Sequence, residues 1–136
     1  MFECRYARHP KLYAIELINE PVSWGVTLDS LNKYYQLGYD AVRKYSSSVY
    51  VILSNRLGIE DSKELFPLAS GMQSVVVDVH YYNLFETKFN DLSVQQNIDF
   101  INNNRSSDLS TITTSNGPLT FVGKYQFFNQ KLAILL

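Results

Sequence analysis

The sequence predicts an α/β fold in which about four parallel strands, with helices between them, form part of an eight-stranded (β/α)8 TIM barrel. Strand-like and helix-like segments alternate along the chain, each strand-like segment is apolar along its length, and polar residues follow the strand ends. Such alternation favours parallel βαβ units, whose strands are buried on both faces and read as continuous apolar runs. The expected strands are 12–18, 49–53, 74–79 and 119–122.

The spacing of these strands fits about half of a barrel. They start near residues 13, 49, 75 and 119, in steps of 36, 26 and 44 residues. An eight-unit barrel of about 250 residues averages roughly 31 residues per unit. A doubly wound open sheet would show the same alternation. However, no glycine-rich phosphate loop follows any strand, which argues against a nucleotide-binding fold.

Two of the expected helices lie between the first three strands. The first is predicted over 27–45, where apolar residues follow helical spacing and Thr27 is a suitable N-cap. The second is predicted over 61–70, because Asp61 and Glu64 fit a start that resembles a capping box and a glycine follows its end.

A third helix is expected between the last two strands. Ser93 and Gln96 form a capping-box pattern. Helical spacing then predicts one shared face for Val94, Asn97, Ile98 and Ile101.

The composition excludes several classes of protein. The net charge of −1 and the pI of about 6.1 lack the basic excess of a nucleic-acid binder. The first residues form no signal-peptide core, and no apolar run approaches the length of a membrane span. Cys4 is the single cysteine, so no internal disulfide is expected. Neither a metal nor a cofactor is expected.

Polar residues gather at the carboxyl ends of the predicted strands. Asn19 and Glu20 follow the first strand, His80 and Tyr82 follow the third, and Lys124 follows the fourth. In a barrel these ends share one face and converge on one pocket. Each residue taken alone has a structural explanation, such as a solvated carboxylate or a satisfied hydrogen-bonding group. The candidate site therefore depends on their coming together.

These strand ends carry a resemblance to a known family. The run IELINEP at 15–21 resembles the Asn-Glu-Pro strand end of glycoside hydrolase family 5, the cellulase family. The segments 25–58, 75–85 and 94–123 resemble its plant subgroup of cellulases and glucan 1,3-β-glucosidases. Asn-Glu-Pro alone is a weak motif. Followed by Asp-Val-His-Tyr-Tyr and then Leu-Thr-Phe-Val-Gly at this spacing, it is a specific one.

The resemblance implies that the chain consists of two parts. Residues 1–123 would be a partial family 5 catalytic barrel that matches strands four to seven, and residues 124–136 would be a divergent C-terminal tail. The expected reason is a truncated gene model, and a purposeful half-barrel is the alternative. A half-barrel leaves strands 12–18 and 119–122 with open edges. Self-association through these edges is therefore expected.

The resemblance also implies roles for the candidate residues. Glu20 matches the general acid/base, and Asn19 matches the residue that hydrogen-bonds the sugar 2-hydroxyl. His80 and Tyr82 match a His-x-Tyr pair whose tyrosine orients the nucleophile. A retaining glycosidase needs two carboxyl groups about 5–5.5 Å apart, one to donate a proton and one to attack the anomeric carbon. Trp24, in a loop, is either a sugar-binding platform or a ring packed on its own domain.

Lys124 departs from the family pattern. The resemblance implies a nucleophilic Glu, commonly within Gly-Glu-Trp, where this chain has Gly123-Lys124-Tyr125. An ammonium group cannot accept the glycosyl group. A cation near Glu20 also favours the ionised carboxylate over the protonated acid. Hydrolysis is therefore expected to be lost in this chain.

Two functional classes follow. The first is a retaining O-glycosyl hydrolase of β-glucan-type polysaccharides, inactive in this form, without a cofactor, and extracellular by resemblance although no signal peptide is apparent. Its expected partner is a β-linked oligo- or polysaccharide, and neither nucleic acid nor membrane is expected. The alternative is a non-catalytic remnant that binds carbohydrate or a protein partner, with Trp24 and the tyrosines as contacts.

Overall fold

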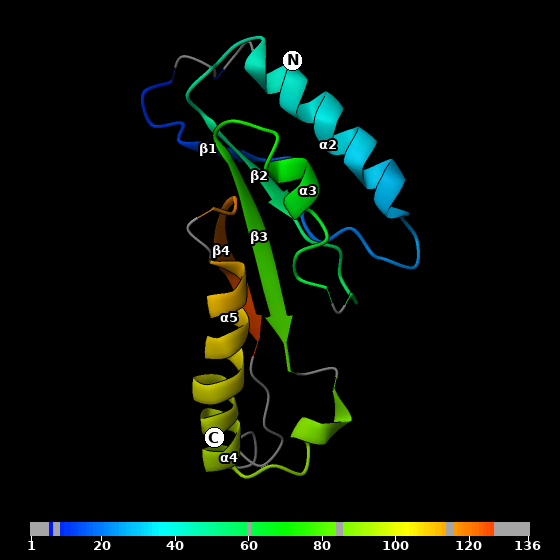
Figure 1. The fold of residues 1–136 in the computed structure, drawn as a ribbon, viewed down its shortest axis with the longest axis vertical. Helices are drawn as coiled ribbons and strands as arrows, with labels where there is room; N and C mark the ends of the chain where they lie inside the picture. The colour runs from blue at the N-terminus through cyan, green and yellow to red at the C-terminus, as the bar shows by residue number, and fades with distance from the viewer. Residues whose placement is uncertain (1–5, 7–8, 60, 84–85, 114–115, 127–136) are drawn as a thin grey trace.

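The computed structural model describes residues 6, 9–59, 61–83, 86–113 and 116–126. Its four strands form one parallel sheet in the order β1-β2-β3-β4 (Figure 1). The strands are β1 (Ala14–Glu16), β2 (Tyr50–Ser54), β3 (Val75–Tyr82) and β4 (Leu119–Gln126). The predicted α/β class with four parallel strands and intervening helices is confirmed. Completion of a TIM barrel remains a prediction.

Strands β1, β3 and β4 differ in length from the sequence prediction. β1 is shorter than 12–18 because the chain bends after Glu16, although Leu17 still donates its amide to the Ile52 carbonyl at 3.3 Å. β3 and β4 run further than predicted because they remain paired up to Tyr82, past a register shift between Val79 and His80. The polar residues at these ends interrupt the apolar pattern, so the sequence did not predict that both strands continue.

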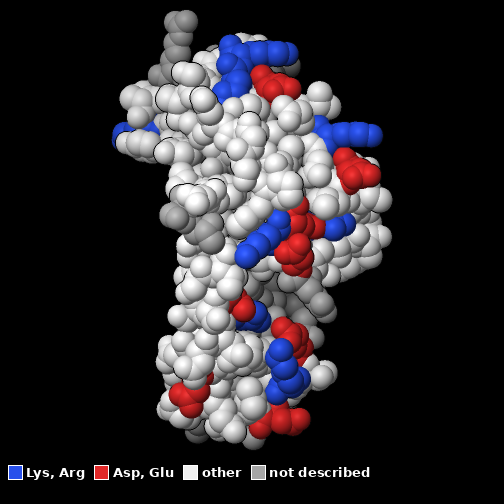
Figure 2. Space-filling model, viewed as in Figure 1, with Lys and Arg blue, Asp and Glu red and all other residues white. Residues whose placement is uncertain are grey.

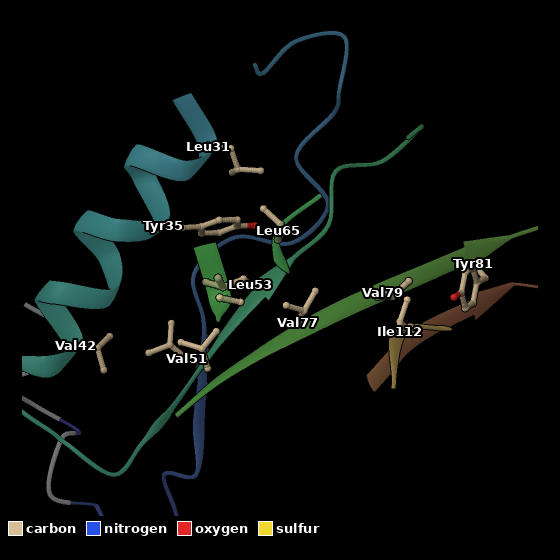
Figure 3. Packing of buried hydrophobic residues seen from close by; sticks show 12 residues of the cluster. Leu31, Tyr35, Val42, Val51, Leu53, Leu65, Val77, Val79, Tyr81 and Ile112 are labelled. Atoms are coloured by element: carbon tan, nitrogen blue, oxygen red, sulfur yellow. The ribbon is translucent and has the colours of Figure 1, made fainter. Parts of the chain in front are cut away.

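The first predicted helix is confirmed as α2 (Leu28–Arg43). Thr27 caps it, since its hydroxyl accepts the amide hydrogen of Ser30. Leu31, Tyr35 and Val42 are buried on one side of α2 and point toward β2 (Figure 3). α2 thereby covers one face of the sheet.

The second predicted helix is mostly wrong. Only α3 (Phe66–Ala69) is α-helical, and its N-cap residue makes no side-chain hydrogen bond. Asp61 instead accepts the amide hydrogen of Lys63, while the Glu64 carboxylate binds the Arg56 guanidinium at 2.7 Å. The two acidic residues are therefore engaged in a loop and an ion pair, and no capping box forms.

The third helix is longer than predicted. A short 3-10 helix, η1 (Thr87–Phe89), comes before α4 (Val94–Phe100), which continues through the π-helical η2 (Ile101–Arg105) into α5 (Ser106–Ile112). The capping box is confirmed, with Ser93 and Gln96 each bonding the other's amide. The predicted face is not buried as a whole, because Val94 and Ile98 are exposed while Asn97 is buried. No helix in the described part of the chain has the length and apolar content needed to cross a bilayer.

The helices cover the two faces of the sheet to different extents. Every second residue of β3, from Val75 to Tyr81, joins the core together with buried residues of α2, α3 and α5. We call this the core face. The alternate residues form the opposite, inner face, which consists of Ala14, Glu16, Tyr50, Ile52, Ser54, Val76, Asp78, His80, Tyr82, Leu119, Phe121 and Lys124.

Candidate active site

The residues predicted at the strand ends come together around one carboxylate. His80 Nδ1 lies 2.6 Å from Glu20 Oε1, and the Tyr82 hydroxyl donates to the same oxygen. Lys124 Nζ lies 3.9 Å from Glu20 Oε2. Two separate strands, β3 and β4, therefore place their polar groups on Glu20, at the carboxyl edge of the sheet.

The loop after β1 holds Glu20 in an unusual conformation. Its φ of 48° lies in the left-handed region, which non-glycine residues adopt only where the surroundings enforce it. The Glu20 amide donates to Ser54 Oγ at 3.2 Å, and the Pro21 carbonyl accepts from the Leu57 amide at 3.0 Å. These bonds tie the loop to the end of β2. The Glu20 side chain is 15% exposed, so it is shielded yet reachable from solvent.

Asp78 belongs to the cluster and was missed by sequence reasoning. Its Oδ2 lies 3.0 Å from His80 Nε2, and its Oδ1 accepts the Gly123 amide at 2.7 Å. The signal that could have found it is its position two residues before His80, which puts both side chains on one face of a strand. A carboxylate inside the apolar run VVVDV is itself unusual, since buried charges need partners.

Gly123 lets β4 approach Asp78. A Cβ at position 123 would lie 2.4 Å from both Asp78 carboxylate oxygens, closer than real Cβ contacts come. The register shift after Val79 pairs His80 with Lys124, so Gly123 is the extra residue of a bulge. The glycine and the bulge together set where Lys124 meets the site.

The hydrogen bonds define what the cluster does chemically. Both ring nitrogens of His80 face carboxylate oxygens, and an imidazole donates to two acceptors only when it carries a proton on each nitrogen. Glu20 Oε1 faces His80 Nδ1 and accepts from the Tyr82 hydroxyl, while the Lys124 ammonium forms an ion pair with Glu20 Oε2 at 3.9 Å. The His80 ring therefore joins two carboxylates, Glu20 and Asp78, in one hydrogen-bonded cluster.

Lys124 is the most open member of the cluster. Its side chain is 53% exposed, and its ammonium lies 5.5 Å from the centroid of the Tyr82 ring. An ion pair this exposed contributes between about 0 and 1 kcal/mol to folding. The Lys124–Glu20 ion pair therefore adds little to the stability of the fold.

Glu16 lies on the same face and completes a group of acidic side chains. Burial raises the pKa of Glu16, the negative charges of Asp78 and Glu20 raise it further, and His80 lowers it. Even so, the described residues contain no cluster of three or more His, Cys, Asp or Glu side chains suited to hold a metal ion.

The remaining predicted residues, Asn19 and Trp24, lie outside the hydrogen-bonded cluster. Asn19 is exposed. Trp24 is 77% exposed, and its ring lies so close to Gly58 that a Cβ there would be 2.9 Å from it. Trp24 lines a cavity of about 970 Å³ that Glu20, His80 and Tyr82 also line. The structure thus places Trp24 at the wall of the cavity that contains the cluster.

Charges outside the cluster are mixed in sign. On the face shown in Figure 2, Lys and Arg residues lie next to Asp and Glu residues in small groups. That face therefore offers no extended basic surface of the kind that binds nucleic acids.

Comparison with known proteins relates the chain to glycosidases. It is 33% identical over 93 residues to a Lachancea kluyveri glucan 1,3-beta-glucosidase, which aligns 61% of this chain with 20% of the relative. It is 36% identical over 76 residues to glucan 1,3-beta-glucosidase 1 of Schizosaccharomyces pombe, with 54% and 18% covered. It is 30% identical over 95 residues to a probable glucan 1,3-beta-glucosidase A of Aspergillus niger, with 69% and 22% covered.

The chain thus spans about a fifth of the length of these relatives. No protein-family model and no solved structure matches it. The similarity supports a relationship to glycoside hydrolases, the enzymes that hydrolyse O-glycosyl bonds. The relatives are fungal, so the plant subgroup and the assignment to family 5 remain predictions.

Proposed function

We propose that this chain forms the acid/base side of a retaining β-glucan glycosidase site of the family 5 kind. Glu20 would be the acid/base residue and Lys124 would stand at the nucleophile position. In this form the chain would bind a β-linked glycan without hydrolysing it. The observation that carries the proposal is the convergence of His80, Tyr82 and Lys124 on the Glu20 carboxylate.

The loss of hydrolysis rests on the charge at the end of β4. Double displacement needs a second carboxylate to attack the anomeric carbon and hold the glycosyl group. Lys124 presents an ammonium instead, 3.9 Å from Glu20 Oε2. It supplies no carboxylate that could attack the anomeric carbon.

The retention of glycan binding rests on the cavity. Trp24 and Tyr82 line it with aromatic surface, which packs against the faces of sugar rings. Asn19 is exposed close to Glu20 in the chain and is available to a sugar hydroxyl. A volume of about 970 Å³ suffices for a short oligosaccharide. An extracellular location belongs to this proposal as well, on the strength of the sequence resemblance.

The experiment that tests the proposal restores the missing carboxylate. Lys124→Glu should introduce measurable hydrolysis of an aryl β-glucoside, and adding Glu20→Gln should remove it. Lys33→Glu makes the same charge change at an exposed position of α2 and should leave the chain inactive. Hydrolysis by the unsubstituted chain that disappears in Glu20→Gln would contradict the proposed inactivity.

Binding is measured separately, by calorimetry with a β-1,3-gluco-oligosaccharide. Trp24→Ala should weaken binding about tenfold, as expected when one stacking ring is lost. Tyr50→Ala, which removes a ring at the opposite end of β2, should leave the affinity unchanged. Absence of binding, or equal affinity in Trp24→Ala and the unsubstituted chain, would contradict the glycan-binding part.

A further inference from the structure

The inner face of the sheet carries exposed apolar side chains. Leu119 is 58% exposed and Phe121 is 39% exposed, and both lie on β4 opposite the core face. Their neighbours Ile52 and Val76 are only half-buried. All-parallel sheets normally have both faces covered. In the part of the chain that the structure describes, α2, α3 and α5 all pack on the core face.

The sheet also has two open edges. β1 and β4 are its outermost strands, and each has a strand neighbour on one side only among the described residues. The free N–H and C=O groups of such an edge are a template for another strand. Four parallel strands amount to half of an eight-stranded barrel, whose interior is filled by inward-pointing side chains. Among the described residues, the inner face exposes apolar side chains that such an interior would bury.

We propose that two copies of this chain close into one eight-stranded parallel barrel through a twofold rotation about the barrel axis. β4 of each copy pairs with β1 of the other, so both open edges are used and neither copy is left with a free edge. Leu119 and Phe121 of both copies then fill the barrel interior. Twofold closure also limits the assembly to a dimer, because a closed ring offers no site for a third copy. The proposal is independent of the chemistry of Glu20.

The register of the new pairing follows from barrel geometry. An eight-stranded barrel of shear eight shifts the register by about eight residues over a full circuit, and so by about four over half. Within the sheet, Glu16 and Leu119 lie in one register row through Ile52 and Val76. A shift of about four residues places Leu119 beside either the partner's Leu12 or the partner's Glu20. Only the first choice makes β4 overlap β1, along residues 121–124.

Charge complementarity supports this register. Continued past the extra residue Gly123, the pairing puts Lys124 beside the partner's Glu16. Lys124 is half-exposed at the end of β4, and Glu16 is exposed at the end of β1. The carboxyl ends of all eight strands face the same way, so each copy contributes a carboxylate to the rim of the other copy's Glu20–Lys124 site.

The first test is the mass of the chain in solution, measured by sedimentation over micromolar to hundred-micromolar concentrations. The unsubstituted chain should have twice its monomer mass. Phe121→Asp puts a charge into the barrel interior and should raise the dimer dissociation constant at least tenfold. Leu37→Asp is the matched control, since Leu37 is 70% exposed on the outer side of α2. A chain that stays monomeric at all concentrations would overturn the proposal.

The second test is disulfide cross-linking, which decides the matter even if Phe121→Asp does not fold. In a Cys4→Ser background, Tyr13→Cys and Thr120→Cys place one cysteine on each edge, at positions that the register pairs between copies. Within one copy these edges are about 14 Å apart, three strand spacings, which no disulfide bridges.

Oxidation of the double variant should therefore give a cross-linked dimer, while either single variant should give none. A single cysteine and its twofold mate lie on opposite sides of the barrel. A double variant that cross-links no more than the single variants would overturn the proposal. A ladder of higher oligomers would overturn it too, because it would show that the strands pair without closing.

Discussion

The two faces of the sheet are built from the same strands but have different roles. On the core face, Val51, Leu53 and Val77 are completely buried against the helices. On the inner face, the intervening positions carry half-buried aliphatic residues and the polar cluster of Asp78 and His80. Because side chains alternate along a strand, stability and chemistry are assigned to alternate residues. Substitutions at adjacent positions should therefore have very different effects.

The largest difference is expected between Leu53→Ala and Ile52→Ala. Leu53 is 0% exposed within the core, so its truncation should lower the free energy of unfolding by about 3 kcal/mol. Ile52 is its neighbour on the half-covered inner face. Ile52→Ala should lower the free energy of unfolding by about 1 kcal/mol. Urea unfolding at a concentration low enough to keep the chain monomeric measures both. Equal losses would show that the inner face is as fully covered as the core face.

Gly123→Ala tests the inner face where it is tightly packed. The added methyl would lie 2.4 Å from the oxygens of Asp78, which is buried and bonded to the Gly123 amide. Strain from this contact should lower the free energy of unfolding by about 2 kcal/mol. It should also shift the ring resonances of His80, which depends on Asp78 for position.

Gly71→Ala is the matched control, because the nearest atom to its added methyl, the Leu68 carbonyl oxygen, is 3.6 Å away. It should change stability by less than about 0.5 kcal/mol. Similar losses in the two glycine variants would mean that chain flexibility, and not the contact with Asp78, sets the effect.

Tyr35 connects the two faces, and its hydroxyl gives the next largest effect. The hydroxyl donates to the Ser54 carbonyl at 2.6 Å, and Ser54 Oγ accepts the Glu20 amide. Burial raises the pKa of Tyr35 well above its ordinary value. Tyr35→Phe leaves a buried carbonyl without its donor and should cost about 1.5 kcal/mol.

The control for this hydroxyl is Tyr34→Phe. Tyr34 also donates to a carbonyl, that of Leu17 at 2.8 Å, but its side chain is exposed and water can replace it. Tyr34→Phe should lower the free energy of unfolding by less than about 0.5 kcal/mol. Thermal or urea unfolding checks both variants. A loss for Tyr34→Phe as large as that for Tyr35→Phe would contradict the importance of burial.

Local signals predicted the N-terminal starts of two helices correctly, because the capping bonds are made between neighbouring residues. Thr27 and the Ser93–Gln96 pair form the bonds that their spacing predicts. Asp61 and Glu64 show the same pattern, yet Glu64 pairs with Arg56, eight residues away. A tertiary ion pair overrode the local pattern. The extension of the third helix through INNNR was missed because asparagine is a poor helix former.

The site was predictable in outline, since parallel strand ends must share an edge. Glu20, His80, Tyr82 and Lys124 meet there, as their positions after strands suggested. Asp78 could not be found by that rule, because it lies inside the predicted strand 74–79 and its partners depend on the bulge at Gly123. The roles of these residues in glycan chemistry remain predictions.

Glu16 should give the smallest effect, and one that depends on pH. Burial, Asp78 and Glu20 raise its pKa above the ordinary value of 4.5, so the folded chain binds this proton more tightly than the unfolded chain. The contribution of Glu16 to the free energy of unfolding is therefore fully present below about pH 4.5 and is lost as the pH rises through the raised pKa. Glu16→Gln should then stabilise the chain at pH 7 and have no such effect at pH 4.

Because Glu16 is largely exposed, solvent screening limits this gain to less than about 0.5 kcal/mol. The measurement is the urea midpoint from pH 4 to 8, at a concentration low enough to keep the chain monomeric. Asp91→Asn, at an exposed position away from the cluster, should show no pH-dependent gain. If Glu16→Gln instead destabilises the chain at pH 7 only when the concentration is raised, Glu16 pairs with a cation of a second copy. The inner face would then be covered by a partner.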